Sequence, residues 1–214
     1  MISCCSHARA AEGLFSRLAC CYRYRYRLLG LERSQRQLVE GLKDAGCRNA
    51  RLLEIGCGVG FLHQTLLEQG ADRAMGVDLS GSLLAEAGKL ARRSGLGERV
   101  EYLQGDFLAL EDAIGAFDIV ILDKVICCYP DAQTLLVRAA GHAHRALALT
   151  YPRAILWNRM GMTVLNRLLG WMNSEFRTYL HDPADVERWL KESGWEKCHE
   201  NQTLSWLTQV FVKP

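Results

Sequence analysis

Several features are missing from this sequence of 214 residues, and each absence narrows the choice of function. No apolar run approaches the roughly 20 residues that span a bilayer, so we expect no transmembrane helix. The first residues lack a basic stretch followed by an apolar core and a cleavage site, so we predict no targeting peptide. Nine cysteines without a secretory signal then indicate a reducing compartment, and we expect a cytoplasmic protein.

The cysteines also lack the spacing of a structural zinc site. Such sites use pairs of cysteines separated by about two to four residues. Cys4-Cys5 and Cys20-Cys21 are adjacent doublets, whose side chains diverge too much to chelate one ion. We therefore expect no metal. The net charge of +2, with 23% charged residues, points to no particular partner.

The middle of the chain alternates short apolar runs with helical stretches, which is typical of βαβ units around a parallel sheet. A helix that opens at Asp182-Pro183 and two closing strands, near enough in sequence for an antiparallel pair, follow this middle part. We therefore predict an α/β fold, a doubly wound, mostly parallel sheet of seven strands. The predicted strands cover 50–56, 73–78, 100–106, 117–123, 145–152, 195–200 and 203–214, with helices at 61–70, 80–95 and 131–142.

One domain accounts for the whole chain in this interpretation, because no repeat or low-complexity linker interrupts it. Its parts are a helical arm (1–45), a ligand-binding core (46–153), a helical insertion (154–181) and a closing unit of one helix and a hairpin (182–214).

A glycine-rich segment, Glu54-Ile-Gly-Cys-Gly-Val-Gly60, joins the first strand to the first helix. Glycine permits a sharp turn and the close approach of a ligand. Ligands of open α/β sheets bind at the carboxyl ends of the strands, where this loop lies. Its G-x-G-x-G spacing differs from the G-x-G-x-x-G of dinucleotide sites, because position 61 is Phe, and the Gly-Lys-Ser/Thr ending of a P-loop is absent.

Acidic residues follow the next two strands. Asp78 ends the second strand, where a carboxylate can accept both hydroxyls of a ribose. Asp106 ends the third, followed by Phe107, which offers an acceptor for an exocyclic amine beside an aromatic wall. Glu54 can hold a cationic ligand or its binding loop. This series suits an adenosine that carries a positive sulfonium and an amino-acid tail.

The segments LLEIGCGVG, GVDLS, GDF and LDKV resemble the successive motifs of class I S-adenosylmethionine-dependent methyltransferases. The resemblance implies a Rossmann-like fold, S-adenosylmethionine as cofactor with S-adenosylhomocysteine as product, and methyl transfer to a small-molecule acceptor. It implies the following cofactor-binding residues: Glu54, Gly56, Cys57, Gly58, Gly60, Asp78, Leu79, Gly105, Asp106, Phe107 and Asp123.

The fourth strand ends in DKVICCYPD, which in this family faces the transferred methyl group. The corner resembles that of magnesium protoporphyrin O-methyltransferases, although Cys128 stands where those enzymes usually carry a histidine. A closer resemblance is to uncharacterised bacterial methyltransferases with a Cys-Cys-Tyr-Pro corner. Tyr129 is the candidate to orient or deprotonate an acceptor, and Asp123 to hold the cofactor amine or a substrate donor. Cys127 and Cys128 are interpreted as a pocket wall, with thiolate chemistry at Cys128 as the alternative.

Two helical segments are predicted to close the site. In the arm, residues 15–42, the substrate or cofactor candidates are Tyr22, Tyr26 and Arg27. The insertion, residues 155–173, has apolar residues at helical spacing and is a lid or packs in the core. A dimer surface, or a helix on a membrane surface with Trp157 and Trp171 at the interface, is the alternative. Trp157 and His181 are the further substrate candidates.

Two other functions remain open at this point. Residues 1–36 carry seven arginines, which would allow RNA or protein methylation through the arm. Neither Asn-Pro-Pro-Tyr nor Asp-Pro-Pro-Tyr occurs, so we do not expect a nucleic-acid partner. The other possibility is a non-catalytic module that binds S-adenosylmethionine. The acceptor atom and the oligomeric state do not follow from the sequence.

Overall fold

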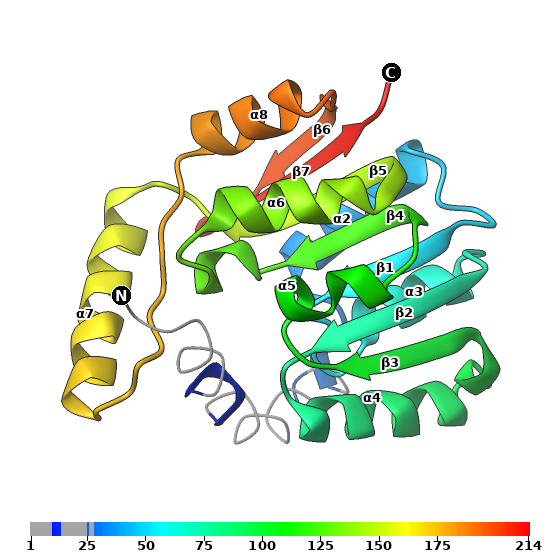
Figure 1. The fold of residues 1–214 in the computed structure, drawn as a ribbon, viewed down its shortest axis with the longest axis horizontal. Coiled ribbons are helices and arrows are strands. Elements are labelled where there is room, and N and C mark those ends of the chain that lie inside the picture. Colours follow the sequence, from blue (N-terminus) through cyan, green and yellow to red (C-terminus); the bar gives the residue numbers. More distant parts are fainter. Residues whose placement is uncertain (1–9, 14–24, 26–27) are drawn as a thin grey trace.

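The computed structural model of the protein describes residues 10–13, 25 and 28–214, and the arm candidates Tyr22, Tyr26 and Arg27 lie outside these residues. Seven strands form one twisted sheet with helices on both faces (Figure 1). The strand order is β3-β2-β1-β4-β5-β7-β6. The predicted doubly wound, seven-stranded fold is confirmed.

The first five strands of the chain are parallel, and the last two run antiparallel to their neighbours. β5 pairs with β7 in the register Ala148↔Val210, and β6 pairs with the other edge of β7. The C-terminal hairpin therefore extends the parallel sheet on the β5 side. The strands are β1 (Arg51–Ile55), β2 (Arg73–Asp78), β3 (Val100–Gln104), β4 (Phe117–Asp123), β5 (Ala143–Pro152), β6 (Glu196–Gln202) and β7 (Trp206–Val212).

The helices cover the two faces of the sheet in two groups. One hydrophobic core lies between one face of the sheet and three helices, α2 (Arg33–Asp44), α3 (Phe61–Glu68) and α4 (Gly81–Arg93). A second hydrophobic core lies between the opposite face and the helices α5 (Phe107–Leu110), α6 (Ala132–Gly141) and α8 (Pro183–Glu192). The short helix α5 lies where the sequence pattern predicted no element.

Alternation along the strands explains the two cores. In β4, Val120 and Leu122 belong to the α6 side, whereas Ile119 and Ile121 belong to the α2 side, because successive side chains of a strand point to opposite faces. Since both faces are covered, the strand is an unbroken apolar run rather than an alternating one. Helix caps match the sequence: the Ser80 side chain accepts a hydrogen bond from Leu83 N (3.3 Å), and that of Asp182 from Ala184 N (2.9 Å).

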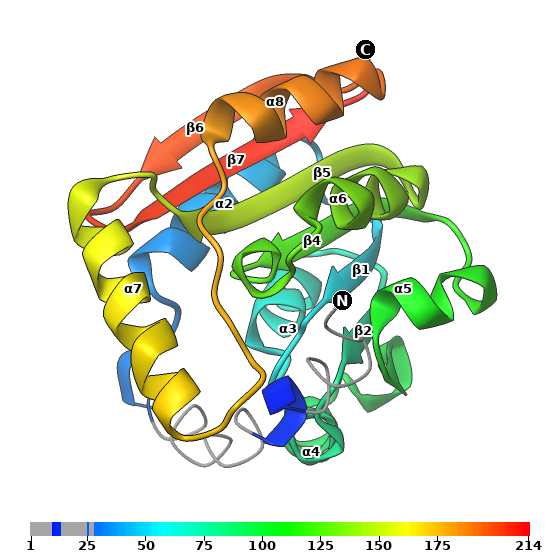
Figure 2. The same cartoon turned by 60° about the vertical axis from the view of Figure 1, so that its left-hand side comes forward.

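Helix α7 (Leu156–Trp171) stands beside the sheet (Figure 2). Most of its large apolar side chains are exposed. Leu169 is its one buried residue, and no residue of α7 lines the central cavity. The interpretation of the insertion as core packing is therefore wrong, and Trp157, 75% exposed, is not a cavity residue. The exposed apolar residues of the segment are Leu156, Trp157, Met160, Val164, Leu165, Leu168, Trp171 and Met172.

In the part of the chain that the structure describes, no helix is long and apolar enough to cross a membrane. The same residues contain no group of three or more metal-ligating side chains.

Candidate active site

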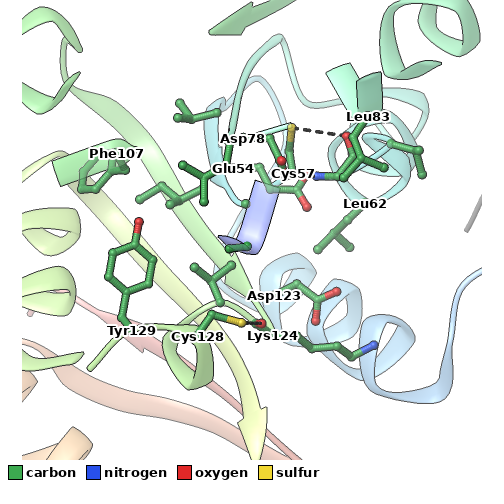
Figure 3. A pocket seen from close by; sticks show the side chains of 18 of the residues that line it. Glu54, Cys57, Leu62, Asp78, Leu83, Phe107, Asp123, Lys124, Cys128 and Tyr129 are labelled. Atoms are coloured by element: carbon green, nitrogen blue, oxygen red, sulfur yellow. Dashed lines mark hydrogen bonds between the residues drawn. The ribbon is translucent and has the colours of Figure 1, made fainter. Parts of the chain in front are cut away.

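A cavity of about 480 Å³ opens at the carboxyl ends of the central strands (Figure 3). This volume is in the range of pockets that bind small organic ligands. Every cofactor-binding residue that the sequence implied lines the cavity, with the single exception of Gly60, and so do Tyr129, Asp123 and Cys128. The predicted residues are thus brought together from β1, β2, β3 and β4.

The glycine loop turns at Gly56 and Gly58, with φ of 67° and 55°, a left-handed conformation that side-chain-bearing residues rarely adopt. A Cβ atom at Gly56 would lie 2.5 Å from Val125 Cγ2, so the loop and the strand-four corner approach each other only because this residue is glycine. A Cβ at Gly58 would meet nothing within 4 Å. Gly58 therefore faces free space in which a ligand fits.

Gly60 has a different role from the one predicted. It precedes α3 with φ 76°, and a Cβ there would lie 2.7 Å from His63 Cε1. Gly60 makes room for the buried His63 ring and does not line the cavity. This correction follows from the helix start, which the spacing of glycines alone does not reveal.

Asp78 fastens the loop to the second strand. Its Oδ2 accepts a hydrogen bond from Gly58 N and its Oδ1 one from Ser80 N, both at 2.8 Å. Burial raises the pKa of this carboxyl, and the two backbone hydrogen bonds oppose the rise. The carboxylate predicted to accept hydrogen bonds from a ribose therefore also accepts one from the backbone N–H of Gly58.

Glu54 and His63 form a buried pair beneath the loop. Glu54 Oε2 accepts from the His63 backbone N (3.2 Å) and lies 2.6 Å from His63 Nδ1, while His63 Nε2 lies 3.1 Å from the Tyr102 hydroxyl. Both residues are buried: Glu54 is 3% exposed and His63 is 0% exposed. Burial raises the pKa of Glu54, and contact with His63 works against the rise. The sequence analysis missed His63, whose signal was a histidine two residues into the helix after the loop.

Asp106 is linked to Tyr129. Asp106 Oδ1 accepts a hydrogen bond from the Tyr129 hydroxyl at 2.6 Å and one from Leu108 N at 3.1 Å, which caps α5. Phe107 is 1% exposed and packs edge-on against His142, with ring centroids 5.5 Å apart. The Phe107 ring is part of the hydrophobic core. Little of its surface is exposed to a ligand, so it offers little of the predicted aromatic wall.

The two cysteines of the corner differ in their surroundings. Cys128 lines the cavity, whereas Cys127 is buried behind it, with the two sulfur atoms 4.0 Å apart. The contact with Cys128 and burial both raise the pKa of the Cys127 thiol. A thiol held protonated is a poor nucleophile, which favours packing as the role of Cys127.

His181 braces the corner from outside the cavity. Its Nε2 lies 2.9 Å from the Ile126 carbonyl oxygen, and its ring stacks on Tyr179 with centroids 6.4 Å apart. Burial lowers the pKa of His181, so the neutral imidazole is favoured. Tyr179, absent from the sequence predictions, lines the cavity and donates its backbone N–H to Cys127 O at 2.7 Å. His181 thus supports the wall and is not in the lining.

Two residues at the N-terminal end of α2, Glu32 and Gln35, also line the cavity, and no sequence motif predicted them. Gln35 Nε2 donates to Asp123 Oδ2 at 2.8 Å, and Glu32 forms an ion pair with Lys124 at 2.5 Å. The Asp123 side chain also interacts with the side chain of Thr150, its neighbour across β4 and β5. Burial is the main cause that raises the pKa of Asp123. Lys124 could have been predicted, because it directly follows Asp123. Gln35 is 88 positions from Asp123 in the sequence, and Glu32 is 92 positions from Lys124.

We expect Asp123→Asn to stabilise the fold by about 1 kcal/mol at pH 7, because the neutral amide avoids the cost of burying a charged carboxylate. The pKa of Asp123 is higher in the folded state than its ordinary value of 3.8. As pH rises above 3.8, the unfolded chain therefore loses this proton before the folded protein does, and the buried carboxyl lowers the free energy of unfolding. The gain should shrink as pH falls toward that value. Chemical denaturation at several pH values, with exposed Asp112→Asn as control, measures it; a variant less stable than the parent at pH 7 would contradict the argument.

Comparison with known proteins gives the family. The family model described as "Methyltransferase domain" matches residues 52–148, from β1 to β5. The ubiquinone biosynthesis O-methyltransferase of Methylococcus capsulatus is 31% identical over 151 residues, which are 67% of this chain and 62% of that protein. The chain belongs to the class I S-adenosylmethionine-dependent methyltransferases. The chain spans 62% of the length of that relative, less than two thirds.

The chain is also similar to magnesium protoporphyrin IX methyltransferases, the branch that the corner resembled. The chloroplastic magnesium protoporphyrin IX methyltransferase of Arabidopsis thaliana is 27% identical over 157 residues, 72% of this chain and 49% of that one. The solved structure of magnesium protoporphyrin IX methyltransferase from Synechocystis PCC 6803 with bound SAM has a TM-score of 0.72 at 19% identity, over all of both chains. At this identity the likeness concerns the fold, which the two proteins share.

Proposed function

We propose that this protein binds S-adenosylmethionine and catalyses methyl transfer to a small-molecule acceptor. The observation that carries the proposal is the convergence of the glycine loop and the strand-end acids, Asp78, Asp106 and Asp123, on one cavity. The sequence relationship to O-methyltransferases of ubiquinone biosynthesis supports the same reaction type.

The residues of the cavity fit the cofactor. Gly58 leaves free space, Asp78 offers acceptor oxygens for ribose hydroxyls, and Asp106 lies at the end of the third strand for the adenine amine. The carboxylate of Asp123, in the cavity lining, is an acceptor suited to the amino group of the methionine part. When bound, S-adenosylmethionine supplies a methyl group activated by a positively charged sulfur.

The chain itself contributes orientation. Tyr129, Cys128 and Tyr179 wall the cavity where the acceptor would lie, and holding the acceptor in line with the methyl group supplies much of the acceleration in such a reaction. The hydroxyl of Tyr129 donates a hydrogen bond to Asp106. We therefore assign Tyr129 to orientation of the acceptor, ahead of proton abstraction.

Incubation with S-adenosylmethionine labelled in the methyl group, and with cell extract separated into small molecules, nucleic acid and protein, tests the proposal. We expect label in the small-molecule fraction and none when Asp78→Ala protein is used. Label in RNA or protein would replace the proposed acceptor by a macromolecule. Cofactor binding without label in any fraction would favour a non-catalytic binding module.

A further inference from the structure

A cluster of charged residues at the mouth of the cavity has no role in the cofactor site described above. Glu32 bridges two cations: it forms ion pairs with Arg25 and with Lys124. All three residues line the cavity. Their side chains are 40%, 27% and 20% exposed for Arg25, Glu32 and Lys124, so the cluster is partly shielded from water.

The order of the strands places this cluster on the acceptor side. The proposed adenine, ribose and methionine contacts lie at the ends of β3, β2 and β1, and the proposed methyl position at the end of β4. Tyr129 and Lys124 point to different parts of the cavity in Figure 3, so an anionic group held by Lys124 would lie apart from the acceptor atom beside Tyr129. The Lys124 Nζ lies 4.9 Å from the ring centroid of Trp206. Trp206 begins β7, two places beyond β4 in the sheet. The ammonium group is thus directed away from the cofactor strands.

The backbone at Lys124 has an unusual conformation. Its φ is 62°, in the left-handed region, and its N–H donates to Thr150 O at 2.8 Å. Non-glycine residues in this conformation cost free energy and are concentrated at ligand sites. The contacts with Glu32 and Trp206 account for where the side chain ends.

We propose that Lys124, together with Arg25, binds an anionic oxygen group, such as a carboxylate, on the methyl acceptor, with Glu32 as the internal counter-ion that this group replaces or joins. Arg25 and Lys124 share the carboxylate of Glu32. The second acid beside Lys124 is the buried Asp123, whose charged form burial disfavours, so N–H groups of the two cations are available to a ligand anion. The rest of the lining is mostly apolar, including Leu62 and Leu83. The acceptor is accordingly an apolar body with an acidic group.

Binding of a matched pair of probes, 2-naphthoate and 2-naphthamide, to the protein saturated with S-adenosylhomocysteine tests this specificity by calorimetry. The inference rests on the proposed function, and S-adenosylhomocysteine binding is measured first: its absence contradicts the proposed function, not this inference alone. We expect the parent protein to bind the naphthoate at least tenfold more tightly than the amide. Lys124→Met should abolish this preference and leave binding of S-adenosylhomocysteine unchanged.

Glu32→Gln removes the competing carboxylate and should strengthen naphthoate binding several-fold. Lys89→Met, which breaks the exposed pair with Glu86, is the matched control and should change neither probe. Equal binding of the two probes, or binding of neither, overturns the inference. A loss of S-adenosylhomocysteine affinity in Lys124→Met, with the probe preference retained, would also overturn it and assign the cation to the carboxylate of the cofactor.

Discussion

Replacing Asp78 with alanine is expected to weaken S-adenosylmethionine binding at least tenfold. Its carboxylate accepts hydrogen bonds from the backbone of Gly58 and Ser80, and in the proposed complex also from the ribose. One hydrogen bond to a charged group is worth about 1.5–3 kcal/mol, and the mutation also releases the loop that approaches the cofactor. Calorimetry with S-adenosylmethionine or S-adenosylhomocysteine measures the loss.

The matched control for this variant is Asp72→Ala, an exposed acid just before the other end of the same strand. We expect it to leave the affinity unchanged, because it lies away from the cavity. If Asp78→Ala binds as tightly as the parent protein, the assignment of this residue to the ribose is wrong.

Replacing Glu54 with alanine is expected to destabilise the fold by about 3 kcal/mol or more. The change leaves the fully buried His63 ring without the carboxylate at 2.6 Å, and breaking a buried pair by removing one partner costs about 3–5 kcal/mol. For a domain of this size, the melting temperature should fall by roughly 10 °C. Thermal unfolding followed by circular dichroism measures the change.

Glu54→Gln is the discriminating control, because the amide oxygen still accepts a hydrogen bond from His63. We expect it to recover most of the lost stability. An alanine variant that unfolds at the parent temperature would mean that the His63 ring finds another partner and that the pair contributes little to the fold.

The sequence predicted the features that depend on local pattern. Strand β4 was predicted with its observed limits, 117–123, because an apolar run that ends at an acid needs no distant information. Asp78 was predicted to lie at the cavity, and does so, because the end of a parallel strand fixes where its last side chain lies.

Features that depend on contacts between distant segments were not predictable in this way. Whether Gly60 borders the cavity or makes room for His63 depends on how α3 begins, and Phe107 is drawn into the core by α6. Gln35 reaches Asp123 across 88 residues. The amphipathic pattern of α7 indicated its helix correctly, but it did not reveal that most of its large apolar side chains are exposed, since periodicity carries no information on which neighbour covers a face.

The position of β7 has a consequence for how the protein is made. β7 follows β6 along the chain, yet it lies between β5 and β6, and among the described residues β6 pairs with no other strand. Its Gln209 accepts a hydrogen bond from Tyr151 and donates to Glu187 and Glu200, so one residue joins β5, α8 and β6. A nascent chain that has not yet reached Trp206 therefore carries an open β5 edge and an unpaired β6, the kind of exposed strand that chaperones protect from aggregation.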